Sequence, residues 1–183
     1  MKYFLNFLAL SITLILSLGL TIGFANAKSD TTNDTNSNEI ASALIEESDF
    51  QALSKKMKQQ SLGLLLMFHA ENCPYCALME NEILSPMVKS GEYDKRIFIR
   101  KLQIDDTREI TDFNGETVQP SDISDRYNAS LTPTLVFLDA DGNKQAETMV
   151  GINTVDYFGV YLDEEIDKMM QNLAKTKEQK KEK

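Results

Sequence analysis

The chain has 183 residues, and its 28 acidic residues outnumber its 19 basic ones, giving a net charge of −9 at pH 7. This excess of negative charge argues against binding to nucleic acid or to anionic lipid, because both need basic surfaces. Once an N-terminal leader is set aside, the length suits one domain with a core of its own. We expect that domain to span residues 39–174.

The first 27 residues have the pattern of a secretory signal peptide. Lys2 precedes an uncharged run over residues 3–24, and Ala25-Asn26-Ala27 matches the small-x-small motif of a signal-peptidase site. We therefore expect cleavage after Ala27 and an envelope location, most simply the bacterial periplasm. Two alternatives stay open: an uncleaved signal that anchors the chain to the inner membrane, and a eukaryotic secretory route. Residues 28–38 are polar and predict a flexible leader.

The first half of the domain predicts helices around one buried strand. Apolar spacing over residues 39–60 indicates an amphipathic helix, broken near Ser48, with Ser48 and Asp49 capping its second part. Residues 62–68, LGLLLMF, form a continuous apolar run typical of a strand buried on both faces. Helical spacing resumes after the two cysteines, and Ser85-Pro86 predicts the start of a new short helix.

The second half predicts further strands, a hairpin and a closing helix. Strands are expected over residues 96–104, 134–138 and 144–150, helices over residues 121–127 and 154–173, and a hairpin within residues 111–118. The hairpin signal is Asn114-Gly115, since both residues tolerate positive φ. Residues 175–183 predict a charged tail that continues as a fraying helix end. The order gives an α/β fold, a central mixed β-sheet flanked by helices.

The only two cysteines, Cys73 and Cys76, follow the buried strand in the motif CPYC. If Cys73 begins a helix, unpaired backbone N–H groups and the positive end of the helix dipole lower the pKa of its thiol. Cys76 lies one turn later and is expected to be more buried. Such a pair suits thiol–disulfide exchange, in which an exposed thiolate attacks and a second thiol resolves the mixed disulfide. Pro74 suits a first helical turn, and Tyr75 offers an aromatic surface at the rim.

Other uses of the cysteine pair fit less well. A structural zinc site needs four ligands, whereas the chain has two cysteines and one histidine, His69. Copper(I) suits two thiolates better, and a copper carrier stays open as an alternative. A purely structural crosslink would close too short a loop to remove much chain entropy. We therefore expect no metal, and no cofactor besides the redox-active disulfide Cys73–Cys76.

With the element order above, the CPYC motif resembles the thioredoxin fold. Further similar segments are residues 100–105 (RKLQID), residues 127–137 (YNASLTPTLVF) and Gly151. The resemblance covers roughly residues 40–170, with these landmarks in order. It implies that Pro133 is a cis-proline opposite the cysteines and that Thr132 presents backbone groups to an extended substrate.

A closer similarity is to exported thioredoxins, including those associated with bacterial sulfur oxidation. It lies in the CPYC pair, the TPT segment of residues 132–134 and the insertion before it, DDTREITDFNGETVQ. The part of this insertion over residues 106–119 carries the predicted hairpin. It either selects partners or is a tolerated loop elaboration.

Two departures from the family pattern bear on the site. Met67 stands where typical thioredoxins have a buried aspartate, and His69 and Asn72 stand where they have tryptophans. The family's lysine opposite that aspartate is retained as Lys101, so the group that accepts the proton of the second cysteine is left open. His69, Glu71 and Lys101 are candidates for tuning the site. The ordinary alternatives are a strand-end histidine for His69 and an exposed loop acid for Glu71.

The resemblance implies an enzyme, a periplasmic thiol–disulfide oxidoreductase. It would reduce disulfides of envelope proteins or cytochrome c precursors and be recharged by a membrane dithiol donor. A thiol oxidase or isomerase, or a non-catalytic carrier of copper(I) or polypeptide on the same fold, are the alternatives. We expect a monomer without a nucleic-acid partner.

Overall fold

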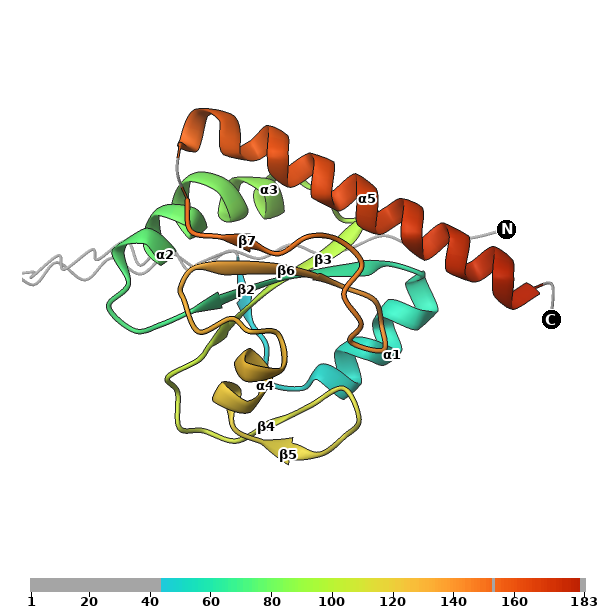
Figure 1. Ribbon diagram of the computed structural model, residues 1–183, viewed down its shortest axis with the longest axis horizontal. Coiled ribbons are helices and arrows are strands. Elements are labelled where there is room, and N and C mark those ends of the chain that lie inside the picture. The colour runs from blue at the N-terminus through green and yellow to red at the C-terminus, as the bar shows by residue number, and fades with distance from the viewer. Residues whose placement is uncertain (1–43, 153, 182–183) are drawn as a thin grey trace, which may run out of the picture. The chain divides into compact units, whose positions relative to one another are not determined.

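The computed structural model describes residues 44–152 and 154–181. The signal peptide and leader predicted over residues 1–38 lie outside this part of the chain. The described residues form a five-stranded sheet in the order β1-β3-β2-β6-β7, with helices on both faces (Figure 1). The strands are β1 (Ile45–Glu46), β2 (Gly63–His69), β3 (Ile97–Gln103), β6 (Thr134–Leu138) and β7 (Met149–Val150), and a separate hairpin consists of β4 (Ile110–Thr111) and β5 (Thr117–Val118).

The central strand, β2, holds the sheet together. It pairs in parallel with β3 and antiparallel with β6, while β1 pairs in parallel with β3 and β7 antiparallel with β6. Residues 63–68 are all buried, because each face of β2 packs under a different set of helices. This confirms both the mixed sheet and the doubly buried strand that the apolar run predicts.

Two helical layers enclose the sheet. The helical elements are α1 (Phe50–Gln60), α2 (Pro74–Met79), the π-helical η1 (Glu80–Leu84), α3 (Ser85–Ser90), α4 (Pro120–Arg126) and α5 (Val155–Lys181). α2, η1, α3 and α5 cover the face that carries Leu65 and Met67, whereas α1 and α4 cover the face that carries Leu66 and Phe68 (Figure 1). The apolar stripe of α5 is buried as its spacing predicts, at Phe158, Leu162, Ile166 and Met169.

Residues 44–48 are not helical, so that part of the predicted helix is wrong. They contain β1, which pairs with β3, and α1 begins only after Asp49, whose carboxylate accepts from the Ala52 N–H at 2.8 Å. The apolar spacing misled because Leu44 is buried just before a strand and not within a helix. Backbone pairing with a distant strand leaves no trace in local spacing. The cap at Asp49 is confirmed.

α3 begins at Ser85, as Ser85-Pro86 predicts, but the chain is already helical before it, from Pro74 onward. Leu84, and not Ser85, precedes α3, with a helical backbone and no side-chain cap. The wide π-helical turn η1 lies just before Pro86, where a missing N–H and a bulky ring disturb an α-helical ladder. With this wider turn before it, the helical backbone continues through Pro86 into α3. α4 begins at Pro120, and its N-cap residue is Gln119, so the helix does not start at Ser121 as predicted.

The last strand is shorter than the predicted residues 144–150. An isolated bridge at Lys144 comes first, and regular pairing resumes only at β7. Between Lys144 and β7 the backbone bonds to α5 and not to a neighbouring strand: the Glu147 N–H donates to Glu165 Oε2 at 2.9 Å. An alternating pattern cannot reveal such a partner from another element. α5 itself runs past its predicted end at Leu173 as far as Lys181.

The insertion forms the hairpin that Asn114-Gly115 predicts. Only Gly115 of the pair has a positive φ, +89°, and its N–H donates to Asp112 O at 3.1 Å. The loop is therefore a three-residue one and not a turn with both residues at positive φ. The ring of Phe113 packs 5.0 Å from that of Phe50 in α1. The hairpin is thus fixed to the domain core on the α1 side.

Candidate redox site at the start of α2

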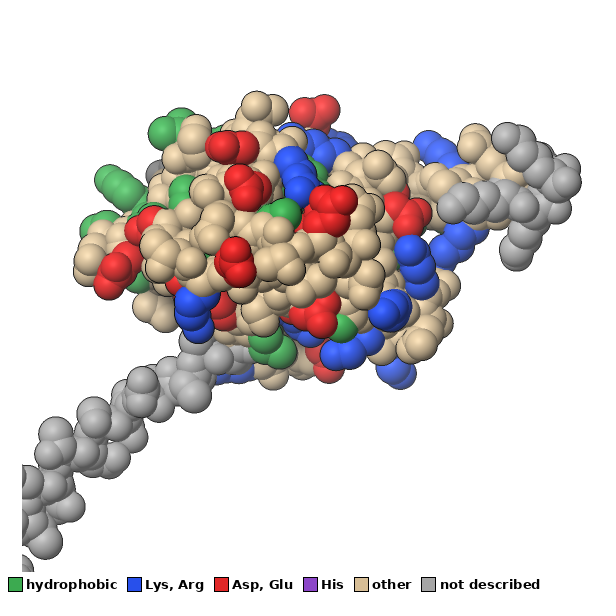
Figure 2. Space-filling view, turned by 90° about the horizontal axis from the view of Figure 1, so that it is seen from below, with side chains coloured by type: hydrophobic (Ala, Val, Ile, Leu, Met, Phe, Trp, Pro, Cys, Tyr) green, Lys and Arg blue, Asp and Glu red, His purple; other side chains and the backbone are tan. Residues whose placement is uncertain are grey.

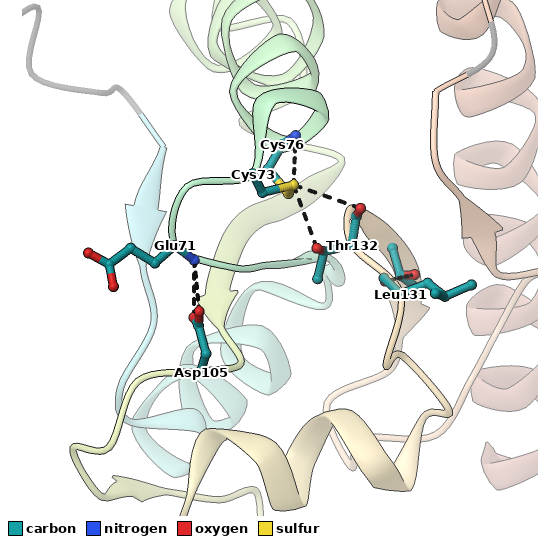
Figure 3. Close-up of a disulfide and its surroundings, with 7 residues drawn as sticks. Glu71, Cys73, Cys76, Asp105, Leu131 and Thr132 are labelled. Carbon is teal, nitrogen blue, oxygen red and sulfur yellow. Dashed lines mark hydrogen bonds between the residues drawn. A yellow bond between two sulfur atoms is a disulfide. The ribbon is translucent and has the colours of Figure 1, made fainter.

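Cys73 and Cys76 form a disulfide at the start of α2 (Figure 3). Cys73 is the N-cap residue and has an extended backbone, while Cys76 lies in the first turn. Their Sγ atoms are bonded at 2.07 Å, and their Cα atoms are 5.2 Å apart. Pro74 occupies the first turn, where an N–H is not needed. The local sequence thus places both sulfur atoms at a helix N-terminus.

The two sulfur atoms have different surroundings. Cys73 is half-buried, whereas Cys76 is only 4% exposed. The Cys76 N–H donates to Cys73 Sγ at 3.2 Å. In the reduced protein a donor at this position favours a negative charge on the Cys73 sulfur. The reachable sulfur is therefore also the one that the helix start favours as an anion.

The loop before β6 lies against the disulfide. The Thr132–Pro133 peptide bond is cis. Thr132 Oγ1 lies 3.5 Å from Cys73 Sγ and is a second donor toward it, while the Thr132 carbonyl oxygen is 3.7 Å from the same sulfur (Figure 3). That carbonyl becomes an acceptor only when Cys73 carries a thiol hydrogen. Pro133 O accepts from the Gly151 N–H at 2.8 Å, which ties this loop to the residue after β7.

Exposed apolar side chains flank the site. Tyr75 is 63% exposed and Leu131 68% exposed. Figure 2 shows apolar side chains gathered at the end of the molecule where α2 and α5 begin, on the left in Figures 1 and 2. The other large exposed apolar side chains of residues 44–152 and 154–181 are Ile45, Val150, Tyr157, Val160 and Tyr161. Exposed apolar side chains beside the disulfide, such as Tyr75 and Leu131, suit contact with another polypeptide.

The profile of the Thioredoxin-like domain family matches residues 50–166, more than half of the chain. The chain belongs to this thioredoxin-like family. The mixed sheet with helices on both faces confirms the predicted thioredoxin fold. Together with the disulfide between Cys73 and Cys76, membership places the protein among the thiol–disulfide oxidoreductases in general.

Solved thioredoxin structures are similar to this thioredoxin-like domain. Thioredoxin from Fasciola hepatica is 18% identical, with a TM-score of 0.46 over 69% of this chain and 99% of its own. Thioredoxin O2 from Arabidopsis thaliana is 21% identical, with a TM-score of 0.46 over 67% of this chain and 94% of its own. A thioredoxin-like protein from Clostridium perfringens is 22% identical, with a TM-score of 0.44 over 74% of this chain and 90% of its own. No curated protein matches the chain.

A pocket of about 440 Å³ opens beside the disulfide of this thioredoxin-like domain. It is lined by His69, Ala70, Asn72, Cys73, Pro74, Cys76, Ala77 and Glu80. Lys101, from β3, pairs with the Glu80 carboxylate, its Nζ lying 2.9 Å from Oε1 and 2.8 Å from Oε2. The lysine that the family resemblance singles out thus reaches the lining of the redox pocket through an acidic partner.

His69 and Glu71 are placed differently from each other. His69 lines the pocket, but its Nε2 lies 2.8 Å from Glu46 Oε2 of β1, so its polar contact is with a carboxylate and not with sulfur. Glu71 donates its backbone N–H to both carboxylate oxygens of Asp105 at 3.1 Å. Its own carboxylate is exposed and points away from the disulfide (Figure 3). Glu71 therefore brings no carboxylate to the sulfurs, which agrees with an exposed loop acid.

Sequence reasoning missed Glu80 and Glu46 as members of the site. Glu80 carried a usable signal, because it follows Cys76 by four residues and so shares its helix face. Glu46 was hidden by the mistaken helix over residues 44–48. Its position beside His69 follows only once β1 is paired with β3.

Among residues 44–152 and 154–181, no group of three or more His, Cys, Asp and Glu side chains could hold a metal ion. Within the same part of the chain, no helix combines the length and hydropathy that a membrane crossing requires.

Proposed function

We propose that the protein is an exported thiol–disulfide oxidoreductase that reduces disulfides of envelope proteins. The observation that carries this proposal is the inequality of the two sulfurs. Cys73 is half-buried beside Thr132 and the cis-proline Pro133, whereas Cys76 is buried behind it. A reductase of this kind needs one reachable thiolate and one protected thiol that resolves the mixed disulfide.

The reaction starts from the reduced pair. The Cys73 thiolate attacks a substrate disulfide, its electron pair forms a new S–S bond, and the substrate bond breaks to release one thiolate. Cys76 then loses its proton and attacks Cys73 Sγ, which forms the intramolecular disulfide and releases the second substrate thiolate. Two electrons pass to the substrate, and its two thiolates take up protons.

We infer that the substrate binds to the surface around Cys73. The backbone of Thr132 suits an extended chain, because it lies beside the attacking sulfur. Tyr75 and Leu131 are exposed on the two segments that meet there and offer apolar contacts of little shape selectivity. We infer that substrates are recognised as flexible cysteine-containing segments, and that Pro74 and Pro133 fix the two walls of the binding surface.

We also propose that the protein is exported and that a separate donor supplies its electrons. The signal-peptide pattern of residues 1–27 and the similarity to exported thioredoxins, including those of bacterial sulfur oxidation, support a periplasmic protein. An oxidising compartment keeps thiols oxidised, so a reductase there needs a dithiol donor in the membrane. Fractionation of cells with N-terminal sequencing tests this part. A mature chain beginning at Lys28 in the periplasm supports it, and an uncleaved chain in the membrane favours an anchored form.

The activity itself is tested by reduction of insulin disulfides with dithiothreitol as electron source. Wild-type protein should accelerate the reaction, C73S should not, and C76S should accumulate a mixed disulfide with its substrate. Turnover that survives in C73S would contradict the proposal. Stoichiometric copper(I) binding without turnover would favour a carrier instead.

The direction of electron flow depends on the reduction potential of the pair. Equilibration with glutathione buffers measures it. A value near about −270 mV suits a reductase, whereas one near about −120 mV suits an oxidase.

A further inference from the structure

A buried ion pair lies next to the resolving cysteine. The Glu80 carboxylate and the Lys101 ammonium group approach to 2.8 Å, and their side chains are only 14% and 16% exposed. Desolvating two charges costs free energy that their attraction does not always return, so such a pair contributes little to stability by itself. A carboxylate and an ammonium group paired at the wall of the redox pocket therefore invite a chemical role.

The position of Glu80 directs its carboxylate toward Cys76. The two residues are four apart, and the Glu80 N–H donates to the carbonyls of Cys76 and Ala77. Long side chains of a helix lean toward its N-terminus, so Glu80 covers the turn that carries Cys76. Both residues line the same pocket of about 440 Å³. The two residues therefore border one space, in which a carboxylate four positions after Cys76 can approach its sulfur directly or through a bridging water.

The strand beneath the disulfide supplies no acid. Met67 of β2 is the Cα partner of Lys101 in β3, and it is fully buried among apolar residues. The other titratable side chain that lines this pocket beside the cysteines is His69 of β2, which is paired with Glu46 of β1. Glu80 is thus the carboxylate of the described residues that borders both the pocket and Cys76.

We propose that Glu80, paired with Lys101, is the proton acceptor for Cys76. In the resolving step the Cys76 S–H bond breaks and its proton passes to a Glu80 oxygen. The freed electron pair forms the bond to Cys73 Sγ, and the bond from Cys73 to the substrate sulfur breaks, so that the substrate leaves as a thiolate. When the disulfide is reduced again, Glu80 returns the proton to Cys76. This inference rests on the proposed exchange activity and assigns its proton transfer.

The test separates the two chemical steps. Reduced protein is mixed with one equivalent of 5,5′-dithiobis(2-nitrobenzoate) in a stopped-flow instrument. The first release of thionitrobenzoate reports attack by Cys73, and the second reports resolution by Cys76. In E80Q the first release should keep its rate, and the second should slow by about tenfold or more at pH 7, since proton acceptors of this kind contribute at least that much. At higher pH hydroxide can remove the thiol proton without Glu80, so the difference should narrow as the pH rises.

Two further variants keep the test decisive. E82Q removes an exposed acid of the same π-helical turn and should behave like the wild type. K101M leaves Glu80 without its cation, so the midpoint of the pH profile of the second release should move to higher pH. K101M gives this readout even if E80Q does not fold.

The outcomes are distinguishable. A second release in E80Q as fast as in the wild type at pH 7, or slowed equally at every pH, overturns the role of Glu80 while leaving the exchange activity intact. For K101M, an unshifted pH profile overturns it as well. Absence of the first release in wild-type protein would instead contradict the proposed function.

Discussion

The hydroxyl group of Thr132 lies 3.5 Å from the sulfur of Cys73, although 59 positions separate the two residues in the sequence. It adds a donor to the one that the Cys76 N–H supplies. Both donors favour a negative charge on Cys73, because hydrogen bonds to the charged form stabilise it. The attacking sulfur is thus prepared by two segments from different parts of the chain.

Replacing Thr132 with valine should raise the pKa of the Cys73 thiol. The substitution keeps the shape but removes the hydroxyl donor, and we expect a rise of about one unit, equivalent to roughly 1.4 kcal/mol. The pH dependence of iodoacetamide alkylation of the reduced protein measures it. Thr132→Ser keeps a donor and should retain the wild-type profile. An unchanged pKa in Thr132→Val would show that the hydroxyl does not act on the sulfur.

Asp112 should make stability depend on pH in the acid range. It is fully buried, and its carboxylate accepts from Arg126 Nη1 at 2.6 Å and from the N–H groups of Asn114 and Glu116 at 2.8 and 2.9 Å. Burial alone raises the pKa of Asp112, but these hydrogen bonds outweigh it and hold the pKa below its ordinary value. The folded state therefore gains stability above the ordinary pKa of about 3.9 and loses it as the pH falls through the lower folded value.

Asp112→Asn tests this dependence by urea unfolding at several pH values. We expect a loss of about 2 kcal/mol at pH 7, since hydrogen bonds to a charged group are lost. The difference from the wild type should begin to shrink below about pH 4, where Asp112 of the unfolded wild-type chain becomes protonated, and shrink further as the pH falls through the lower pKa of the folded state. Asp125→Asn, at an exposed acid of α4 next to Arg126, serves as the control and should change little. A constant difference across the pH range would contradict the assignment.

Phe113→Ala should destabilise the domain without altering catalysis. The ring of Phe113 packs 5.0 Å from that of Phe50, so its loss should cost about 1–3 kcal/mol of the free energy of unfolding. Phe113→Leu should recover part of this. Chemical unfolding measures stability, and insulin turnover per folded molecule should stay at the wild-type value. A fall in turnover would show that the hairpin influences the redox site.

Leu131→Ser should weaken substrate binding and leave the chemical step alone. Leu131 is 68% exposed next to Thr132, so the variant loses apolar contact with a bound chain but no group that touches the sulfurs. With a peptide disulfide as substrate, we expect KM to rise by about three- to tenfold at constant kcat. Ile45→Ser, an equally apolar change on the edge strand β1, should have no effect. A change in kcat would place Leu131 in the chemical step instead.

The selection of partners by the insertion over residues 106–119 stays a prediction. Deleting it is a poor experiment, because Asp112 and Ile110 are buried and the deletion would open the core. Substitutions confined to its exposed side chains, such as Glu109 and Glu116, are the better choice.

Local patterns were sufficient to predict the parts of the fold whose cause is local. The run over residues 62–68 predicts β2 because its burial comes from continuous apolar side chains. The cap at Asp49 and the stripe of α5 follow from helix geometry in the same way. The disulfide partners were also accessible, since a CPYC motif after a buried strand places both sulfurs at one helix start.

Features that depend on distant partners were not accessible. β1 forms because its backbone pairs with that of β3. Just before β7, the Glu147 N–H donates to the Glu165 side chain of α5. The pairing of Lys101 with Glu80 required knowing that η1 and β3 meet. Family resemblance identified the lysine but pointed to an acid on the strand, where this chain has Met67. Only three-dimensional packing shows the acid on the helix instead.

The sulfur of Cys73 gains its special character from neighbours that the folded domain alone brings together, above all Thr132, which lies 59 positions away along the chain. An unfolded chain has none of these neighbours and presents two unremarkable thiols. On this basis the reactivity of Cys73 toward thiol reagents near neutral pH should rise when the chain folds. The speed at which that sulfur is labelled is then a built-in gauge of whether a given molecule has folded correctly.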